Sequence, residues 1–392
     1  MAYQLIGTAL IMQLVSKNKG AEVKSIGHAL APDNIPAFLL DWELTKRCNL
    51  DCSYCGTGVD GGHDNTTQHP PMDECLQTID FMYEYVDLYM QHKKLTQRKV
   101  VLNIYGGESL FYPNIVEILK ESHKRYKPYA DRWELTITTT TNAVINKSIW
   151  HKIIPLIDEF TISYHAENLY KQEKLFFNNL LEVKNKGKRV KCVVMLHNQP
   201  TLWSKSIDAI EFCKTNGIRY IAKPFDNSDL AYSAEQFIYM KDYWNVNNTP
   251  TEEKTISICE GRACCGGRKM SLNNDLKSSV TFVQRQGFKD WYCSVNWFFL
   301  FVQQLTGNVY VNKDCRMGFN GTVEALGNIK SYKNILTNLR NQLNTNSMPI
   351  IQCAKSLCFC GYCAPKAENL EDFKDLIKRN VITDVIKFPT SK

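Results

Sequence analysis

The regular pattern of the chain begins at residue 38, where short apolar runs start to alternate with longer amphipathic stretches. The runs are rich in β-branched, aromatic and leucine residues, which is typical of strands. Six strands are predicted in this part of the chain, at Phe38–Thr45, Lys99–Tyr105, Glu134–Thr140, Phe160–Tyr164, Val190–Leu196 and Ile218–Ala222.

The stretches between these strands have the periodicity of helices. Leu76, Ile79, Met82 and Val86 recur at three- and four-residue steps, which gives Met72–Met90 one apolar stripe. Further helices are expected at Ile115–Tyr126, Lys147–Ile154, Leu169–Lys184 and Lys205–Thr215. Strands alternating with helices predict parallel βα units with right-handed crossovers. The expected fold is therefore α/β, a partial (βα)6 barrel of the TIM type.

The alternation stops after Pro224. Residues 226–258 are polar, and the chain beyond them is rich in cysteine, with a hairpin expected around Gly307 and Asn308. The predicted organisation is an N-terminal extension (1–37), a core barrel (38–225), a linker (226–258), a C-terminal cysteine-rich domain (259–365), and a final helix and tail (366–392).

Composition adds a few limits. No run of about eighteen apolar residues is present, so no membrane span is expected. The N-terminus lacks a basic start and a cleavage site, which favours a cytoplasmic protein with no membrane partner. The net charge of +7 is spread along the chain and does not require a nucleic-acid partner. Fifteen clustered cysteines in a reducing compartment indicate metal ligands or catalysis rather than disulfides.

The strongest chemical signal is Cys48, Cys52 and Cys55, which follow directly on the first strand. Loops after the strands of a parallel barrel converge on its catalytic face. Three thiolates from one loop suit three irons of a four-iron cluster and leave the fourth iron open, as a catalytic zinc keeps one open position. A structural zinc site is the alternative. It needs a fourth ligand, and the next candidate along the chain is His63.

This C-x3-C-x2-C motif, with aromatic Tyr54 before its last cysteine, resembles the radical S-adenosylmethionine (SAM) superfamily over residues 38–225. In that family the open iron binds SAM, and an electron from the cluster cleaves its sulfonium bond. The 5′-deoxyadenosyl radical then abstracts hydrogen from a substrate. The resemblance implies a [4Fe-4S] cluster, SAM, and a low-potential electron donor such as a flavodoxin or ferredoxin.

The resemblance also assigns contacts to SAM. Gly106, Gly107 and Glu108, at the end of the second strand, resemble the GGE motif whose backbone and acid contact the amino group of SAM. Glycine permits close backbone approach, and a carboxylate pairs with an ammonium group. A tight turn is the plain alternative for these three residues.

Three further positions match more loosely. Asn142 follows the third strand as in the Thr-Asn-Gly of relatives, although Ala143 stands in place of the glycine. Ser163 ends the fourth strand, where relatives place a polar contact to the ribose or carboxylate of SAM. Tyr54 is expected to pack near the adenine. Ordinary turn, strand-end and core roles are the alternatives for these residues.

Nine cysteines follow residue 258. Cys293, Gly307, Cys315 and the segment 326–329 resemble a SPASM or twitch extension, which holds one or two auxiliary [4Fe-4S] clusters. The match is partial, because Asn312 stands where relatives place a cysteine. The predicted auxiliary ligands are Cys264, Cys293, Cys315, Cys353, Cys358, Cys360 and Cys363. A zinc knuckle formed by the last four is the alternative.

Other candidates have simpler interpretations. Cys75, Cys192 and Cys213 fall within predicted helices or strands and are read as packing residues. His165 follows the fourth strand and is a weaker candidate to face the substrate, with a structural role favoured.

The resemblance gives the chemistry more firmly than the substrate. Relatives with auxiliary clusters mostly act on peptides or proteins, so the leading prediction is an enzyme of the maturase type that acts on a peptide or protein side chain. Modification of a nucleobase, nucleotide or other small molecule is the alternative. A non-catalytic iron–sulfur or zinc scaffold is the third hypothesis.

Overall fold

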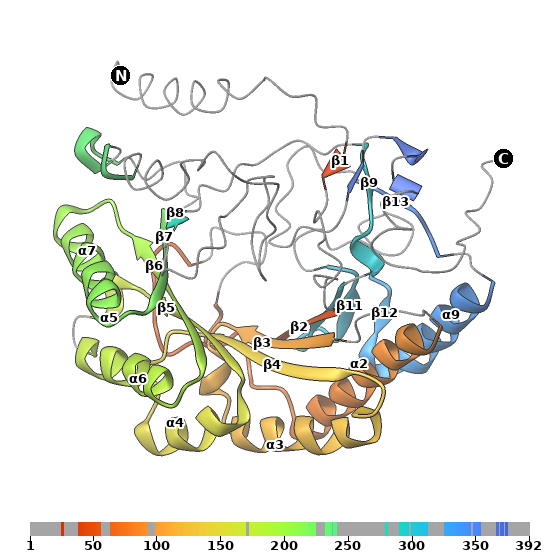
Figure 1. Ribbon diagram of the computed structural model, residues 1–392. Helices are drawn as coiled ribbons and strands as arrows, with labels where there is room; N and C mark the ends of the chain where they lie inside the picture. Colours follow the sequence, from red (N-terminus) through yellow and green to blue (C-terminus); the bar gives the residue numbers. More distant parts are fainter. Residues whose placement is uncertain are drawn as a thin grey trace.

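The structure is a computed structural model (Figure 1), which describes part of the chain's residues. These are 25–26, 38–55, 63–92, 99–169, 172–224, 232–236, 238–240, 279–280, 290–297, 299–312, 325–345, 348–353, 366–367, 369–371 and 373–374.

A ten-stranded sheet, in the order β12-β11-β10-β2-β3-β4-β5-β6-β7-β8, forms the centre of the molecule. Its strands are β2 (Phe38–Thr45), β3 (Lys99–Gly106), β4 (Glu134–Thr141), β5 (Glu159–Tyr164), β6 (Arg189–Leu196), β7 (Arg219–Pro224), β8 (Ser279–Val280), β10 (Phe299–Gln303), β11 (Asn308–Tyr310) and β12 (Gly327–Asn328). The strands from β10 to β8 are parallel, and β11 and β12 are antiparallel. The predicted α/β partial barrel is therefore confirmed.

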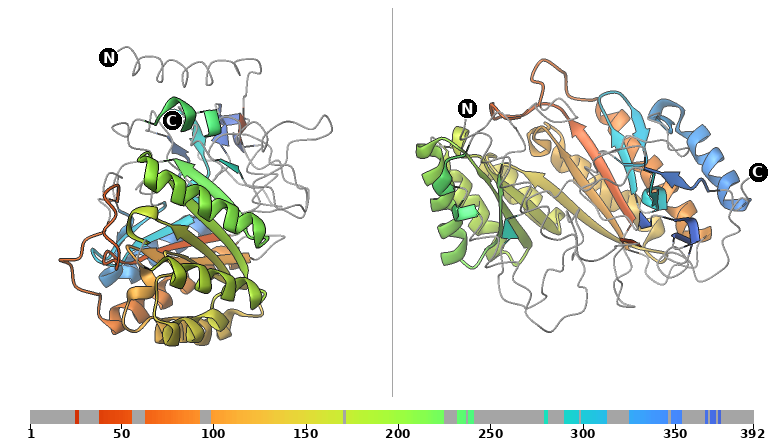
Figure 2. Two further views of the ribbon diagram at one scale, coloured as in Figure 1. Left: turned by 90° about the vertical axis from the view of Figure 1, so that its left-hand side faces the viewer. Right: turned by 90° about the horizontal axis from the view of Figure 1, so that it is seen from above.

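Helices cover one face of this sheet (Figures 1 and 2). They are α2 (Met72–His92), α3 (Ile115–Tyr126), α4 (Lys147–Ile153), α5 (Ala166–Leu169), α6 (Glu173–Asn185), α7 (Pro200–Thr215) and α9 (Tyr332–Asn344). Short 3-10 turns are η1 (Ser109–Phe111), η2 (Lys127–Tyr129), η3 (Ile154–Leu156), η4 (Val295–Trp297) and η5 (Ile329–Ser331). No helix in the described part of the chain has the length and apolar character needed to cross a membrane.

The alternation of side chains along β5 shows how the two faces of the sheet differ. Phe160 and Tyr164 are fully buried against the helices, with ring centroids 5.7 Å from Trp150 and 5.2 Å from Phe176. Because neighbouring residues of a strand point to opposite faces, Ser163 lies on the other face. The opposite face is the inner face of the barrel.

Most predicted elements agree with the structure within a few residues. Two helices differ at their starts: α7 begins at Pro200, a residue favoured at the first helical position, and Ala166–Leu169 forms a separate short helix before α6. The hairpin at Gly307 is confirmed, with φ of 71° and its N–H donated to the Gln303 carbonyl.

The cysteine-rich C-terminal part contributes to both sheets of the molecule. Strand β10 lies parallel to β2, so this part of the chain extends the barrel sheet itself. A second, four-stranded sheet has the order β1 (Ser25–Ile26), β14 (Lys366–Ala367), β9 (Tyr292–Cys293) and β13 (Ile351–Gln352). The predicted division into domains stays a prediction, and most of the predicted final helix and tail falls beyond the described residues.

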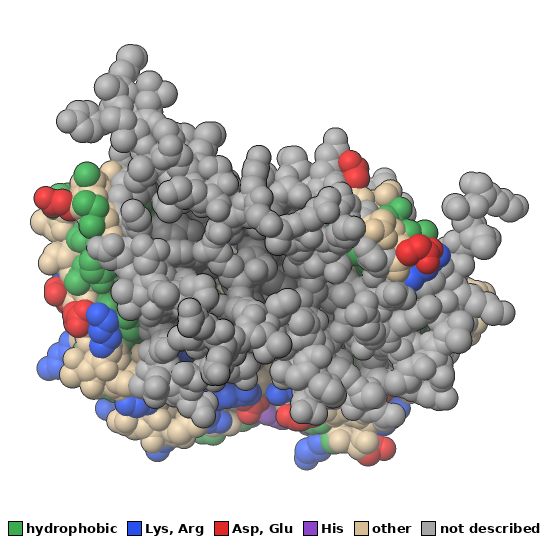
Figure 3. All heavy atoms as spheres, turned by 45° about the horizontal axis from the view of Figure 1, so that its top comes forward, with side chains coloured by type: hydrophobic (Ala, Val, Ile, Leu, Met, Phe, Trp, Pro, Cys, Tyr) green, Lys and Arg blue, Asp and Glu red, His purple; other side chains and the backbone are tan. Residues whose placement is uncertain are grey.

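Three cysteines outside the motif pack in the hydrophobic core. Cys75, Cys192 and Cys213 are completely buried, which confirms the prediction that they pack. Figure 3 shows basic and acidic side chains interspersed on the described part of the surface.

Candidate active site

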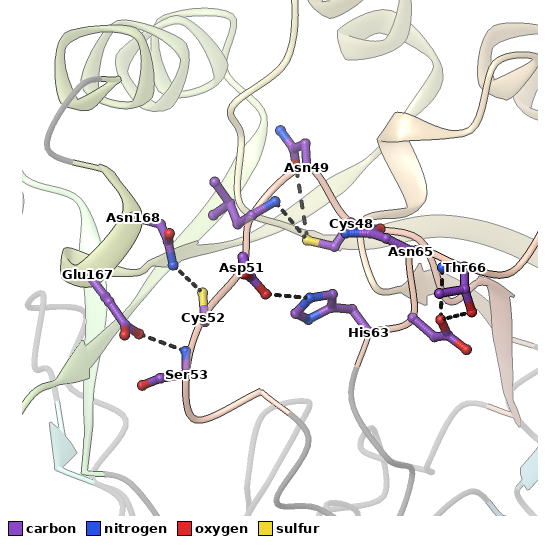
Figure 4. A network of polar contacts seen from close by, with 12 residues as sticks. Cys48, Asn49, Asp51, Cys52, Ser53, His63, Asn65, Thr66, Glu167 and Asn168 are labelled. Atoms are coloured by element: carbon purple, nitrogen blue, oxygen red, sulfur yellow. Dashed lines mark hydrogen bonds and ion pairs between the residues drawn. The ribbon is translucent and has the colours of Figure 1, made fainter.

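The three cysteines of the motif lie on one loop, residues 46–55, which follows β2 and is called the cysteine loop here. Cys52 is buried, Cys48 is half-buried and Cys55 is exposed. A turn joins the last two, because the Cys55 N–H donates to the Cys52 carbonyl at 2.9 Å. Figure 4 shows the loop, with His63 against Asp51 at 3.2 Å. Among the described residues no three His, Cys, Asp or Glu side chains are grouped to hold a single metal ion.

The end of β3 packs directly on the cysteine loop. The N–H of Gly107 donates to the Thr45 carbonyl and the N–H of Glu108 to the Arg47 carbonyl, both at 2.8 Å. A Cβ on Gly106 would lie 2.1 Å from the Thr45 oxygen, and one on Gly107 would lie 2.4 Å from the Lys46 oxygen. Glycine is therefore required here by the fold itself, and a contact of these residues with SAM stays a prediction.

Glu108 is a buried junction between strands. Its Oε2 accepts the Asn142 N–H at 2.6 Å, and its Oε1 accepts the Leu110 N–H at 3.0 Å. Burial raises the pKa of Glu108 to about 7, although these hydrogen bonds oppose the shift. The carboxyl group thus ties the ends of β3 and β4 together, a role that the motif did not reveal.

Asn142 connects that junction to the cysteine loop. Its Nδ2 donates to Asn49 Oδ1 at 2.7 Å and lies 3.8 Å from Cys48 Sγ. The next residue, Ala143, is buried in the left-handed region with φ of 55°, and Asn179 of α6 donates to its carbonyl at 2.8 Å. Asn142 therefore contacts the cysteine loop, and its predicted contact with SAM stays a prediction.

Hydrogen-bond donors approach two of the three sulfurs. The Leu50 N–H lies 3.4 Å from Cys48 Sγ, and Asn168 Nδ2 lies 3.3 Å from Cys52 Sγ. Burial raises the pKa of Cys48 to about 12 and that of Cys52 to about 11, so both are thiols until a metal displaces their protons. Donors aimed at sulfur stabilise thiolates, and this donor set fits an iron–sulfur cluster held by the cysteine loop.

Tyr54 and His165 form a pair beside the cysteine loop. The Tyr54 hydroxyl lies 2.5 Å from His165 Nδ1, and their rings are stacked with centroids 5.9 Å apart. Burial lowers the pKa of His165 to about 4, so its ring is neutral at neutral pH, and burial raises the pKa of Tyr54. His197 meets Tyr54 edge-on, with centroids 6.4 Å apart. Ser163, half-buried, lies two residues before His165, and the predicted SAM contacts of Ser163 and Tyr54 remain predictions.

The inner face of the barrel carries buried polar side chains that the sequence did not single out. Thr138 donates to Asn103 Oδ1 at 3.1 Å, and Asn103 donates to Asp41 Oδ1 at 2.7 Å, in a row across three strands. Nearer the cysteine loop, Gln303 of β10 donates to Glu43 Oε2 at 2.9 Å. A polar interior below a catalytic loop suits a substrate with polar groups.

Two predicted auxiliary ligands come together in the small sheet. Cys293 of β9 faces Ile351 of β13, and the ladder continues to Cys353, whose N–H donates to the Trp291 carbonyl at 2.8 Å. The two buried cysteines are thus diagonal neighbours on one face, a separation of roughly 7–8 Å in antiparallel sheets. The other five, Cys264, Cys315, Cys358, Cys360 and Cys363, lie outside the described residues.

Comparison with solved structures gives several likenesses at low identity. anSMEcpe, solved with bound AdoMet, is 12% identical with a TM-score of 0.48, and the match covers 88% of this chain and 97% of that one. Another structure of it holds AdoMet and the Kp18Cys peptide. SuiB of Streptococcus suis is 15% identical with a TM-score of 0.46, covering 80% of this chain and 66% of that one. No curated protein matches the chain in sequence.

The family comparison bears on the site itself. Residues 42–223 match the model of the radical SAM superfamily. The matched segment contains the cysteine loop, the glycine pair at the end of β3 and the parallel strands up to β7. Members of this family use a [4Fe-4S] cluster and SAM. Residues 42–223 therefore form a radical SAM domain, and the chain is a radical SAM enzyme.

Proposed function

We propose that this radical SAM enzyme acts on a side chain of a peptide or protein. When bound, the [4Fe-4S] cluster and SAM supply a 5′-deoxyadenosyl radical that abstracts hydrogen from the substrate. Cys48, Cys52 and Cys55 hold that cluster. The backbone of Gly106 and Gly107 and the carboxyl group of Glu108 contact the amino group of SAM.

Asn142, Ser163 and Tyr54 complete the proposed SAM site from three different segments. Asn142 donates to Asn49 of the cysteine loop, and Tyr54, which belongs to that loop, contacts His165. The buried polar side chains of the inner face, Asp41 and Glu43 among them, are the groups that we assign to the substrate. These roles agree with loops after parallel strands forming the catalytic face.

The observation that supports a peptide substrate is the diagonal placement of Cys293 and Cys353 on one face of the small sheet. Two buried cysteines on one face of neighbouring strands suit an auxiliary iron–sulfur cluster. Radical SAM enzymes that carry auxiliary clusters mostly act on peptides or proteins, and this is the resemblance on which the proposal rests. The alternative to a peptide or protein substrate is a nucleotide or another small molecule.

The substrate class is testable before the substrate is known. Cells are grown in deuterated medium, and their peptide and nucleotide fractions are incubated separately with the anaerobically reconstituted enzyme, SAM and dithionite. Hydrogen abstraction transfers deuterium to 5′-deoxyadenosine, which mass spectrometry detects. We expect deuterium from the peptide fraction and none from the nucleotide fraction. The reverse result would overturn the peptide proposal and leave the radical chemistry intact.

The auxiliary cluster has its own test. If Cys293 and Cys353 bind one cluster, then Cys293→Ala, Cys353→Ala and the double variant all lose the same complement of iron and sulfide. Cys213→Ala, which removes a packing thiol, is the matched control and should lose none. Twice the loss in the double variant would assign the two cysteines to separate clusters.

A further inference from the structure

Three of the four residues 165–168, directly after β5, contact the cysteine loop. His165 contacts Tyr54 at 2.5 Å, Glu167 accepts the Ser53 N–H at 2.9 Å, and Asn168 donates to Cys52 Sγ at 3.3 Å. Figure 4 shows the last two contacts coming from one side of the loop. We call His165, Glu167 and Asn168 the α5 clasp.

Within the clasp, Asn168 reaches a ligand atom. Its own N–H donates to the His165 carbonyl at 3.0 Å, which closes the turn and directs the side chain toward the loop. Cys52 is the most buried of the three motif cysteines, so solvent contributes little to stabilising charge on its sulfur. A carboxamide presents either its oxygen or its NH2 group, and a thiolate selects the NH2 group.

Hydrogen bonds to the sulfurs are among the features that set the reduction potential of an iron–sulfur cluster. Reduction adds one negative charge that is shared with the sulfur ligands, so a donor at sulfur stabilises the reduced form more than the oxidised form. We propose that Asn168 is a positioning residue whose hydrogen bond to Cys52 raises the reduction potential of the SAM-binding cluster.

Asn168 is the side-chain donor best suited to a test. The donor at Cys48 is the backbone N–H of Leu50, which no substitution removes cleanly, and Asn142 lies farther from sulfur while also serving Asn49. This inference rests on the cluster that the family uses and is independent of the peptide substrate. Failure of either proposal therefore leaves the other standing.

The test is an EPR-monitored redox titration of the reconstituted full chain. Only the cluster with an open iron responds to SAM, so the titrated signal is the component that changes when SAM is added. Asn168→Leu and Asn168→Ala remove the donor, and we expect both to shift the midpoint potential to more negative values. Asn168→Gln keeps the amide donor, so its midpoint potential should lie between the wild-type value and that of the donor-removing variants.

Two further variants separate the hydrogen bond from other effects. Asn178→Leu makes the same chemical change at an exposed position of α6 and should leave the potential unchanged. Glu167→Gln keeps an acceptor for Ser53 without touching the sulfur and should give no negative shift. An unchanged potential in both donor-removing variants, an equal negative shift in Glu167→Gln, or loss of the SAM-responsive signal in both would overturn the proposal.

Discussion

Replacing Gly107 by alanine should push the end of β3 away from the cysteine loop. The new Cβ would lie 2.4 Å from the Lys46 oxygen and 2.5 Å from the Arg47 oxygen, where ordinary contacts begin at 3.4 Å. Both atoms belong to the backbone, so the clash is relieved only if the loop moves by about 1 Å. That movement carries the Cys48 ligand with it.

The expected cost follows from the hydrogen bonds that this movement stretches. They join Gly107 to Thr45 and Glu108 to Arg47, each at 2.8 Å. A lost hydrogen bond costs about 1 kcal/mol, and a buried group left without a partner costs a further ~1–3 kcal/mol. We therefore expect Gly107→Ala to lower the free energy of unfolding by about 2–5 kcal/mol.

Urea unfolding of the apo protein measures this loss, and iron content after anaerobic reconstitution measures the effect on the site. Gly187→Ala is the matched control, because Gly187 has φ of +70° but nothing within 4 Å of its added Cβ. It should lose about 1–2 kcal/mol through backbone strain alone and keep its iron. Equal losses in the two variants, with iron retained in both, would refute the steric account of Gly107.

Two other positions give sharp expectations. Burial raises the pKa of Glu108 from 4.5 to about 7, so its contribution to stability is fully present below pH 4.5 and is lost as pH rises through about 7. Relative to wild type, Glu108→Gln should therefore gain stability between pH 5 and pH 8 in urea unfolding, and a constant difference would contradict this. Ala143→Val puts a β-branched residue at φ of 55° in a fully buried position and should cost at least about 2 kcal/mol, whereas Ala143→Gly should stay within about 1 kcal/mol of wild type in the same assay.

The barrel was predictable because its signals are local. Each strand from β2 to β7 is a short run rich in apolar or β-branched residues between helical stretches, and the chain order of these elements is also their order in the sheet. The short helix α5 was missed because four residues are too few to show a helical period. The pairing of β10 with β2 was not predictable either, since it joins segments more than 250 residues apart.

The residues of the candidate site also differ in whether the sequence could identify them. The cysteine motif and Gly106–Glu108 lie at the ends of strands, and their resemblance to radical SAM motifs could be recognised from the sequence. Asn168 could not, because its contact with Cys52 spans 116 residues and depends on how β5 lies against the cysteine loop. The placement of Cys293 and Cys353 as diagonal neighbours likewise depends on the register of β9 and β13, which cannot be derived from the cysteine spacing.

Release of 5′-deoxyadenosine from SAM tests the central claim most directly. The wild-type protein, reconstituted with iron and sulfide under anaerobic conditions and reduced with dithionite, should release it. A variant with Cys48, Cys52 and Cys55 all changed to alanine should release none, even with its C-terminal cysteines intact. Equal release from both proteins, or none from a wild-type protein that carries its full iron, would contradict the account.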